Sequence, residues 1–306
     1  MIKHFLTGAE LTPGELAALL DRAQQYKEHR IRLSAQRGVL AAKTVALIFE
    51  KPSTRTRMSS EVAVYEMSGH PMILSGDAMQ LSRGESLQDT ALVASRFVHA
   101  IGIRTGAHSV VEELAKNATV PVFNLLTADH HPMQGLADLL TLRQRFDELP
   151  GLKLAYVGDG NNVTASLMVL GALAGVNVAV ATPPGYEPDP AAVALARDVA
   201  QHGAEITLTN DAAEAATVAD AVYTDVWVSM GDEDSEQKKA DLEPYALNGA
   251  LMSLAKPGAI ALHCLPAHEG EEITGEVLYG EQSAVFDQAE NRLHVQKALL
   301  EHLLVD

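Results

Sequence analysis

The densest group of chemically active side chains lies between Ser53 and Arg57, where the sequence reads Ser-Thr-Arg-Thr-Arg. An apolar run, Val45–Phe49, precedes it, and a helical pattern follows to Glu66. A helix N-terminus offers unpaired backbone N–H groups and the positive end of the helix dipole. Hydroxyls add donors, and guanidinium groups bind phosphate through two hydrogen bonds at once. The segment predicts a phosphate site, although a capped helix with two surface arginines is the alternative.

Three more side chains in the first half could bind a polar ligand. Arg104 follows the apolar run Ala100–Ile103, and His131 and Gln134 are three residues apart at an expected helix start. Residues at this spacing share one face of a helix. Histidine can donate to a carbonyl oxygen, and an amide can both accept and donate. Taken singly, Arg104 could equally be a surface or salt-bridge arginine, and a histidine near a helix start is more often a capping or packing residue.

The second half carries groups suited to an amino acid. Asp225 ends the apolar run that begins at Ala221, and Asn162 begins the helix expected after Leu154–Val157. A carboxylate can hold an ammonium group, and an amide can hold a carboxylate. Taken singly, a turn aspartate and a helix-capping asparagine are the alternatives. Cys264, the only cysteine, follows another apolar run. A lone cysteine is more often an inert core residue than a reactive one.

These motifs, in this order, resemble those of the aspartate/ornithine carbamoyltransferase family. They are Ser53–Arg57, His131-Pro132-Met133-Gln134, Asp225–Gly231, His263-Cys264-Leu265-Pro266 and Glu290-Asn291-Arg292. The ornithine branch is indicated by Cys264, where the aspartate branch typically has proline, and by Ser229-Met230-Gly231. The resemblance implies an enzyme of arginine metabolism and the urea cycle. Its reaction would move the carbamoyl group of carbamoyl phosphate onto the side-chain amine of ornithine, giving citrulline and phosphate.

The resemblance also implies roles for individual residues. The carbamoyl phosphate ligands would be Ser53, Thr54, Arg55, Thr56, Arg57, Gln80, Arg104, His131, Gln134, Cys264, Leu265 and Arg292. The ornithine ligands would be Asn162, Asp225, Ser229 and Met230, and the catalytic groups Arg104, His131, Asp225 and Cys264. No metal or organic cofactor is expected. In the family the loop that holds Gln80 crosses to a neighbouring subunit, which implies a homotrimer, or a multiple of trimers, with shared active sites.

Strands alternate with helices along nearly the whole chain, which predicts an α/β fold with two domains, each an open parallel sheet flanked by helices. The expected strands are Val45–Phe49, Pro71–Leu74, Ala100–Ile103, Pro121–Leu125, Leu154–Val157, Val176–Ala181, Ile206–Leu208, Ala221–Asp225 and Ile260–Leu262. The polar segment Asp147–Gly151, with its Pro-Gly pair, is the expected boundary. We therefore expect a carbamoyl-phosphate-binding domain over 1–148 and an ornithine-binding domain over 149–288. The last helix, 289–306, would pack back on the first domain.

Composition bounds the class of protein. The chain has 306 residues, of which 47% are hydrophobic and 21% are charged, as in soluble globular proteins. A net charge of -17 argues against nucleic acid and anionic membranes as partners. One cysteine cannot form an internal disulfide, and no stretch is apolar enough for a membrane span or a signal peptide. We therefore expect a cytoplasmic protein.

Several alternatives stay open. Gly158-Asp159-Gly160 follows a strand as in dinucleotide-binding proteins, but Val163 replaces the third glycine and no acidic ribose ligand follows. Aspartate carbamoyl transfer, a carbamoyltransferase acting on another amine and a noncatalytic homologue are the other readings. Glu269 is a departure from the family, which usually has arginine there, so a charge is reversed near the Cys264 segment.

Overall fold

The computed structural model describes residues 3–30, 38–76, 79, 84–228 and 235–305. By its internal contacts the chain divides into two compact units. The first unit comprises Met1–Leu140 and Glu290–Asp306, and the second comprises Thr141–Ala289. Both divisions fall inside helices, namely α6 (Pro132–Phe146) and α13 (Val285–Leu304). The segment expected as the domain boundary begins directly after α6.

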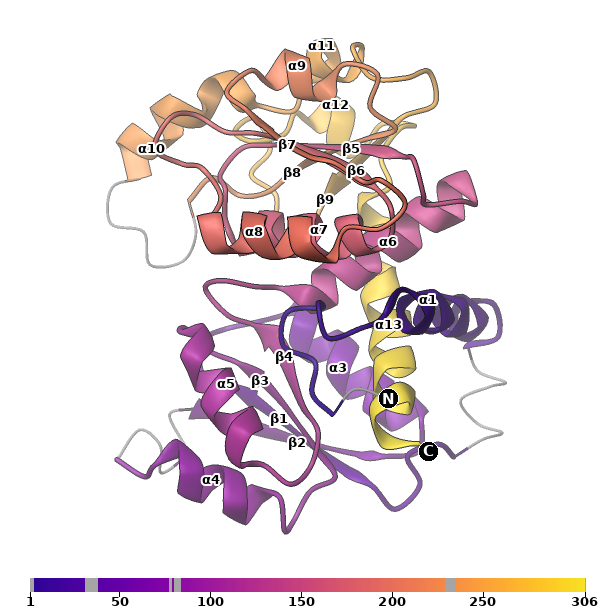
Figure 1. Cartoon of the computed structure of the whole chain (residues 1–306), viewed down its shortest axis with the longest axis vertical. Helices are drawn as coiled ribbons and strands as arrows, with labels where there is room; N and C mark the ends of the chain where they lie inside the picture. The colour runs from indigo at the N-terminus through magenta and orange to yellow at the C-terminus, as the bar shows by residue number, and fades with distance from the viewer. Residues whose placement is uncertain (1–2, 31–37, 77–78, 80–83, 229–234, 306) are drawn as a thin grey trace. The chain divides into compact units, whose positions relative to one another are not determined.

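The first unit is built on a four-stranded parallel sheet with the order β2-β1-β3-β4. Its strands are β1 (Thr44–Phe49), β2 (His70–Ser75), β3 (Ala100–Arg104) and β4 (Val122–Leu126). Its helices are α1 (Pro13–Glu28), α3 (Arg55–Glu66), α4 (Leu87–Ala94), α5 (His108–Asn117) and parts of α6 and α13. As Figure 1 shows, α4 and α5 cover one face of the sheet, whereas α3 and α13 lie on the other.

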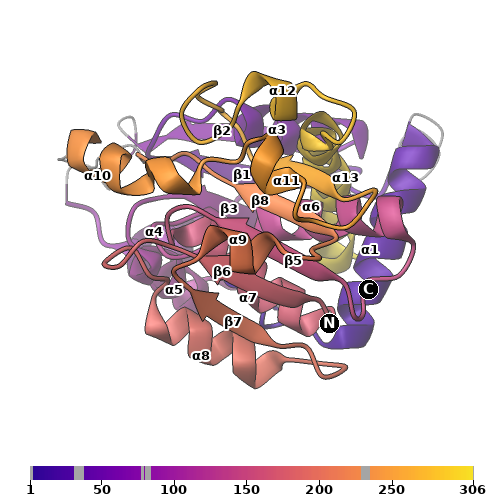
Figure 2. The same cartoon turned by 90° about the horizontal axis from the view of Figure 1, so that it is seen from above.

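The second unit is built on a five-stranded parallel sheet with the order β7-β6-β5-β8-β9. Its strands are β5 (Lys153–Val157), β6 (Asn177–Ala181), β7 (Ile206–Thr209), β8 (Ala221–Thr224) and β9 (Ile260–His263). Its main helices are α7 (Asn162–Leu173), α8 (Pro190–Val199), α9 (Ala212–Ala216), α10 (Ser235–Leu242), α11 (Gly249–Met252) and α12 (Gly275–Leu278). In Figures 1 and 2, α7 and α8 lie on one face of this sheet and α9 on the other.

Each sheet has its own hydrophobic core, and most strands are buried on both faces, whereas the edge strands β2 and β7 are partly exposed. In the first unit Ile48, Ile101 and Ile103 pack against Val111 and Leu114 of α5. In the second unit alanines and valines of β5, β6 and β8 pack against α9, α11 and α12. Buried parallel strands need continuous apolar runs, and this explains why all nine expected runs form strands.

The α/β fold class is confirmed. Within the described residues, no helix is both long enough and apolar enough to cross a membrane.

Candidate functional site

The order of strands in each sheet defines where a ligand is expected. In the first unit the chain reverses its direction of travel across the sheet between β1 and β3, and in the second unit between β5 and β8. In open α/β sheets, ligands bind beyond the carboxyl ends of the strands at such switch points. Ser53 follows β1 and Arg104 ends β3 in the first unit, and Asn162 and Asp225 follow β5 and β8 in the second.

The first switch point brings Ser53 and Arg104 together. Phe49, at the end of β1, is the register partner of Arg104, at the end of β3. Arg104 Nη1 donates to Ser53 Oγ over 3.4 Å, which links the end of β3 to the turn after β1. Thr54 is the N-cap of α3, but its side chain makes no capping hydrogen bond. The first backbone N–H groups of α3 therefore remain available to an anion.

A buried chain of hydrogen bonds places Arg292 beside this turn. Arg292 Nη2 donates to Thr56 Oγ1 over 2.9 Å, and Nη1 donates to Gln134 Oε1 over 2.7 Å. Gln134 Nε2 in turn donates to Asp138 Oδ1 over 2.8 Å. All four residues are at most 4% exposed. Asp138 was not singled out from the sequence. Its place one helical turn after Gln134 was the signal that could have found it.

His131 lies buried at the start of α6. Burial, followed by the positive charges of Arg292, Arg104 and Arg55, holds the pKa of His131 well below its ordinary value. The imidazole is therefore neutral near pH 7, and it can donate a hydrogen bond without carrying a charge. The same effect shows that these guanidinium groups share one electrostatic neighbourhood, so a dianion there meets a strong positive potential.

Hydrogen bonds with Thr127 and Asn124 fix the turn that leads into His131. Thr127 donates its backbone N–H to His130 O over 2.9 Å, and His130 N donates to Thr127 Oγ1 over 3.2 Å. Asn124 is fully buried, and its amide donates to the same carbonyl over 3.4 Å. The turn is thus held by side chains of the β4 region, which sets the position of the helix start behind it.

Arg57, another expected carbamoyl phosphate ligand, lies apart from these buried contacts. Arg57 is exposed, and its Nε lies 3.9 Å from Glu61 Oε2, one helical turn further along α3. Gln80 lies outside the described residues. Arg55, the first residue of α3, is partly buried.

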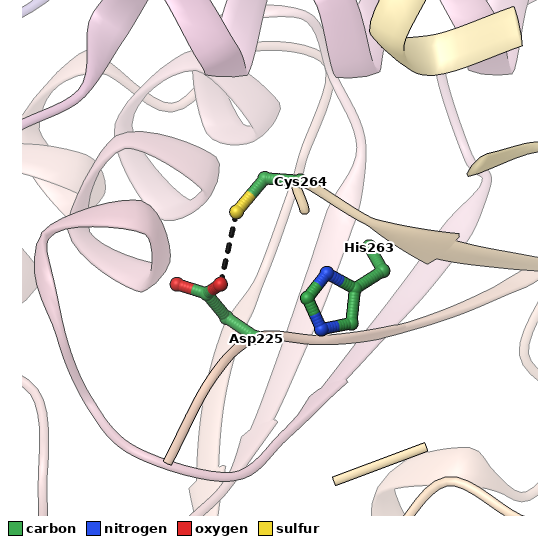
Figure 3. Close-up of side chains that lie close together, drawn as sticks. All are labelled: Asp225, His263 and Cys264. Atoms are coloured by element: carbon green, nitrogen blue, oxygen red, sulfur yellow. Dashed lines mark hydrogen bonds between the residues drawn. The ribbon is translucent and has the colours of Figure 1, made fainter. Parts of the chain in front are cut away.

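The second switch point brings Asp225 and Cys264 together (Figure 3). Asp225 follows β8 and is 4% exposed, and Cys264 follows β9. The Cys264 thiol donates to Asp225 Oδ1 over 2.9 Å, and Asn161 Nδ2 donates to Asp225 Oδ2 over 2.8 Å. The Asp225 carboxylate thus accepts hydrogen bonds from residues that follow β5 and β9, the two neighbours of β8 in the sheet.

Asn161, rather than Asn162, makes the described hydrogen bond to Asp225. Asn161 is the N-cap of α7, and its side-chain oxygen Oδ1 accepts from the backbone N–H groups of Val163 and Thr164. Asn162 is the first residue of the helix and is partly buried. The preference of asparagine for the N-cap was the signal that could have identified Asn161. The expected ligands Ser229 and Met230 lie outside the described residues.

The segment after β9 is held by two buried side chains. His263 Nε2 lies 3.1 Å from Glu272 Oε1, and Leu265 N donates to His263 Nδ1 over 2.8 Å. Both side chains are fully buried. Glu272 was not singled out from the sequence.

The two clusters suit opposite charges. The first presents Arg55, Arg104, Arg292 and a helix N-terminus to an anion, with a neutral histidine as an additional donor. The second presents a buried carboxylate, which favours a cation such as an alkyl ammonium group. Asp225, His263 and Cys264 also have potential metal-ligand atoms within 4.8 Å of one another. Those atoms are already hydrogen-bonded among themselves or to Leu265 and Glu272.

Family models match the two halves of the chain separately. Residues 3–144 match the model of the carbamoyl-P binding domain of aspartate/ornithine carbamoyltransferase, and residues 150–303 match that of its Asp/Orn binding domain. The chain is 52% identical to an ornithine carbamoyltransferase of Acidothermus cellulolyticus over 306 residues, which covers 99% of this chain and 97% of the relative.

Solved structures give the same result. The ornithine carbamoyltransferase of Thermus thermophilus is 45% identical, with a TM-score of 0.90 and 99% of both chains covered. That of Pyrococcus furiosus is 44% identical, with a TM-score of 0.94, over 99% of this chain and 97% of the other. The chain belongs to the aspartate/ornithine carbamoyltransferase family.

Proposed function

We propose that this chain transfers the carbamoyl group of carbamoyl phosphate to the side-chain amine of ornithine, giving citrulline and phosphate in arginine metabolism. The observation that carries the choice of substrate is the buried Asp225 carboxylate hydrogen-bonded to Cys264. A buried carboxylate attracts the ammonium form of ornithine and repels a second carboxylate such as that of aspartate. The similarity to ornithine carbamoyltransferases over nearly the whole chain supports the same choice.

Carbamoyl phosphate would bind to the first unit. Ser53, Thr54, Arg55 and Thr56 offer hydroxyl, guanidinium and backbone donors at the start of α3. Arg57, Gln80 and Arg292 would complete the phosphate ligands, and Gln134 would meet the carbamoyl amide. The support for this assignment is the buried Arg292–Thr56 contact at the strand switch point, together with the positive potential that acts on His131.

The reaction is an attack by a neutral amine on a carbonyl carbon, followed by loss of phosphate. Negative charge builds on the carbonyl oxygen as the tetrahedral intermediate forms, and Arg104, His131 and Thr56 are the proposed donors to that oxygen. A preorganised donor of this kind contributes roughly 3–4 kcal/mol to the transition state. Because His131 is neutral, it would act as a donor and not as a source of positive charge.

Ornithine would bind to the second unit, with Asp225 and Cys264 orienting its side-chain amine and Asn162, Ser229 and Met230 holding its amino-acid end. An alkyl ammonium group has a pKa of about 10.4, so less than about a thousandth is neutral at pH 7. The ammonium group must lose one proton before the neutral amine attacks. After the attack the same nitrogen must lose a second proton, and the departing phosphate is a suitable acceptor for that one. The contacts of Cys264 and Leu265 with the carbamoyl group remain predictions from the family resemblance.

We further propose a homotrimer, or a multiple of it, in the cytoplasm. A cyclic trimer joins two different surfaces of each subunit. Large apolar side chains are exposed on α3, at Met58 and Tyr65, and around α4, at Leu92, Val93 and Phe97. Tyr65 and Phe97 are 73% and 72% exposed, which is unusual for aromatic side chains without a partner. The single cysteine fits a reducing compartment.

The substrate assignment is tested by measuring initial rates with carbamoyl phosphate and, in parallel, ornithine, putrescine or aspartate. The proposal predicts the highest kcat/KM for ornithine. Faster turnover of putrescine would assign the chain to another amine, faster turnover of aspartate to the other branch of the family. No turnover of any amine by a folded protein would indicate a noncatalytic homologue.

A further inference from the structure

Glu272 is a fully buried carboxylate that contacts both ends of the segment carrying Cys264. Its Oε1 atom accepts from His263 Nε2 over 3.1 Å and from the backbone N–H of His268 over 2.6 Å. Between these two anchors lie Cys264 to Ala267. One oxygen atom therefore ties the start of this segment to its end. Burial alone raises the pKa of Glu272, but the hydrogen bonds outweigh it and the pKa is lowered, so the group is ionised.

The partners of His263 define its protonation. Its Nδ1 accepts from Leu265 N over 2.8 Å, so that nitrogen carries no proton. Its Nε2 must then carry the proton that it shares with Glu272. Glu272 stabilises this tautomer and so keeps Nδ1 free to accept from Leu265. The backbone N–H of His263 is held as well, because it donates to Gln288 Oε1 over 2.9 Å.

The segment needs such support because its backbone is unusual. Leu265 has a φ of 61°, in the left-handed region that residues with a side chain rarely adopt. A conformation of this kind persists only where surrounding contacts determine it. Leu265 N donates to His263 Nδ1, and the thiol of the preceding residue, Cys264, donates to Asp225.

We propose that Glu272 is a positioning residue: through His263 and Leu265 it holds the Cys264 thiol against Asp225, and thereby shapes the site for the amine. The proposal rests on the function proposed above for Asp225 and Cys264. Glu272 does not contact the substrate. It acts through the tautomer of His263 and through the backbone of the segment.

The test compares three variants. Glu272→Met keeps the size of the side chain but removes the acceptor. Glu272→Gln keeps one carbonyl oxygen, which is enough because both hydrogen bonds go to the same atom. Glu271→Gln is the matched control, since Glu271 is a neighbour in sequence that pairs with Lys239 at the surface. If Glu272→Met does not fold, His263→Gln replaces it, because that change removes the acceptor for Leu265 N.

The first readout needs no enzymatic activity. Cys264 is the only cysteine, so its rate of alkylation by iodoacetamide reports on this segment alone. Loss of a buried hydrogen-bonded anchor is expected to speed alkylation about tenfold or more in Glu272→Met. Glu272→Gln and Glu271→Gln should react like the wild type. An unchanged rate in Glu272→Met, or in His263→Gln, would overturn the proposal even if the enzyme is active on ornithine.

The second readout separates positioning from general destabilisation. Glu272→Met should raise KM for ornithine about tenfold or more, with KM for carbamoyl phosphate unchanged. Glu272→Gln should restore the wild-type ornithine KM. Equal changes in both KM values, or a lower yield of folded protein with normal kinetics, would show a merely structural role. If alkylation changes as expected but ornithine is not a substrate, the positioning role stands and the proposed function fails.

Discussion

The guanidinium group of Arg292, on α13, donates a 2.7 Å hydrogen bond to the amide oxygen of Gln134, on α6. The amide nitrogen of Gln134 donates to Asp138, which can only accept while it is ionised, so the orientation of the amide is fixed. A carbonyl oxygen accepts two hydrogen bonds, so Gln134 Oε1 can still receive one from a carbamoyl NH₂ group. Arg292 thus both adds positive charge and orients the amide expected to meet the substrate.

We expect Arg292→Lys to weaken the binding of carbamoyl phosphate. A lysine keeps the charge, but its compact ammonium group cannot reproduce the planar fork that reaches Thr56 and Gln134 together. Loss of one charge-assisted hydrogen bond costs roughly 1.5–3 kcal/mol, which corresponds to about tenfold or more in Kd. Titration calorimetry with carbamoyl phosphate measures this. Arg197→Lys, in the second unit, is the control, and equal affinity in both variants would remove Arg292 from the site.

We expect Cys264→Ser to weaken ornithine binding while turnover persists. A serine hydroxyl can still donate to Asp225, but it is smaller than the thiol and changes the packing beside the amine. The apparent affinity for ornithine should improve from about pH 6 to 8.5 in both proteins, because only the neutral amine attacks. The measurement is kcat/KM against pH. Abolished turnover, or a flat profile with ornithine still bound, would make the thiol a direct proton acceptor.

Stability should fall in acid partly because of His294. Burial lowers the pKa of His294 to about 4, against the opposing effect of Glu290. Between pH 4 and the ordinary pKa of about 6.5, the unfolded chain binds a proton at His294 that the folded chain does not. The contribution of His294 to the free energy of unfolding is therefore fully present above pH 6.5 and is lost as the pH falls toward 4. The group should reduce the free energy of unfolding by about 2 kcal/mol between pH 8 and pH 5.

Urea unfolding at these two pH values, for the wild type and for His294→Gln, measures this contribution. The variant should show a smaller loss of stability between pH 8 and pH 5 than the wild type. The same dependence on pH in both proteins would mean that His294 is not buried in its neutral form.

Shared active sites predict complementation between subunits. Gln80→Ala and Arg292→Ala should each be nearly inactive as pure proteins. In mixed trimers some interfaces would combine an intact Gln80 from one subunit with an intact Arg292 from another. Activity should therefore reappear after dissociation and reassembly of the mixture. Proven subunit exchange without any recovered activity would contradict a site built from two subunits.

The sequence predicted the strands well and the short helices poorly, for a physical reason. Buried parallel strands require apolar runs, and such runs stand out between polar segments. The helices α9, α11 and α12 span five residues or fewer, so no periodic pattern can develop in them. They are fixed by packing against the second sheet, which the local sequence does not show.

The site, too, could be predicted only in part from the sequence. The end of a strand places residues such as Arg104 and Asp225 at the edge of a sheet, and the sequence could predict this. The choice between Asn161 and Asn162 depends on which residue becomes the N-cap, a difference of a single position. Glu272 stands beside Glu271 and looks like part of a solvated charged pair. Only the folded chain shows that one carboxylate is buried while its neighbour pairs with Lys239 near the surface.

Carbamoyl transfer to ornithine forms citrulline and releases inorganic phosphate in the same turnover. The most direct test measures citrulline and inorganic phosphate in the same reaction mixture, with carbamoyl phosphate present and with ornithine either added or omitted. We expect equal amounts of citrulline and phosphate with ornithine, and no phosphate above the spontaneous background without it. Phosphate released without citrulline, or release that does not depend on ornithine, would contradict the proposed transfer.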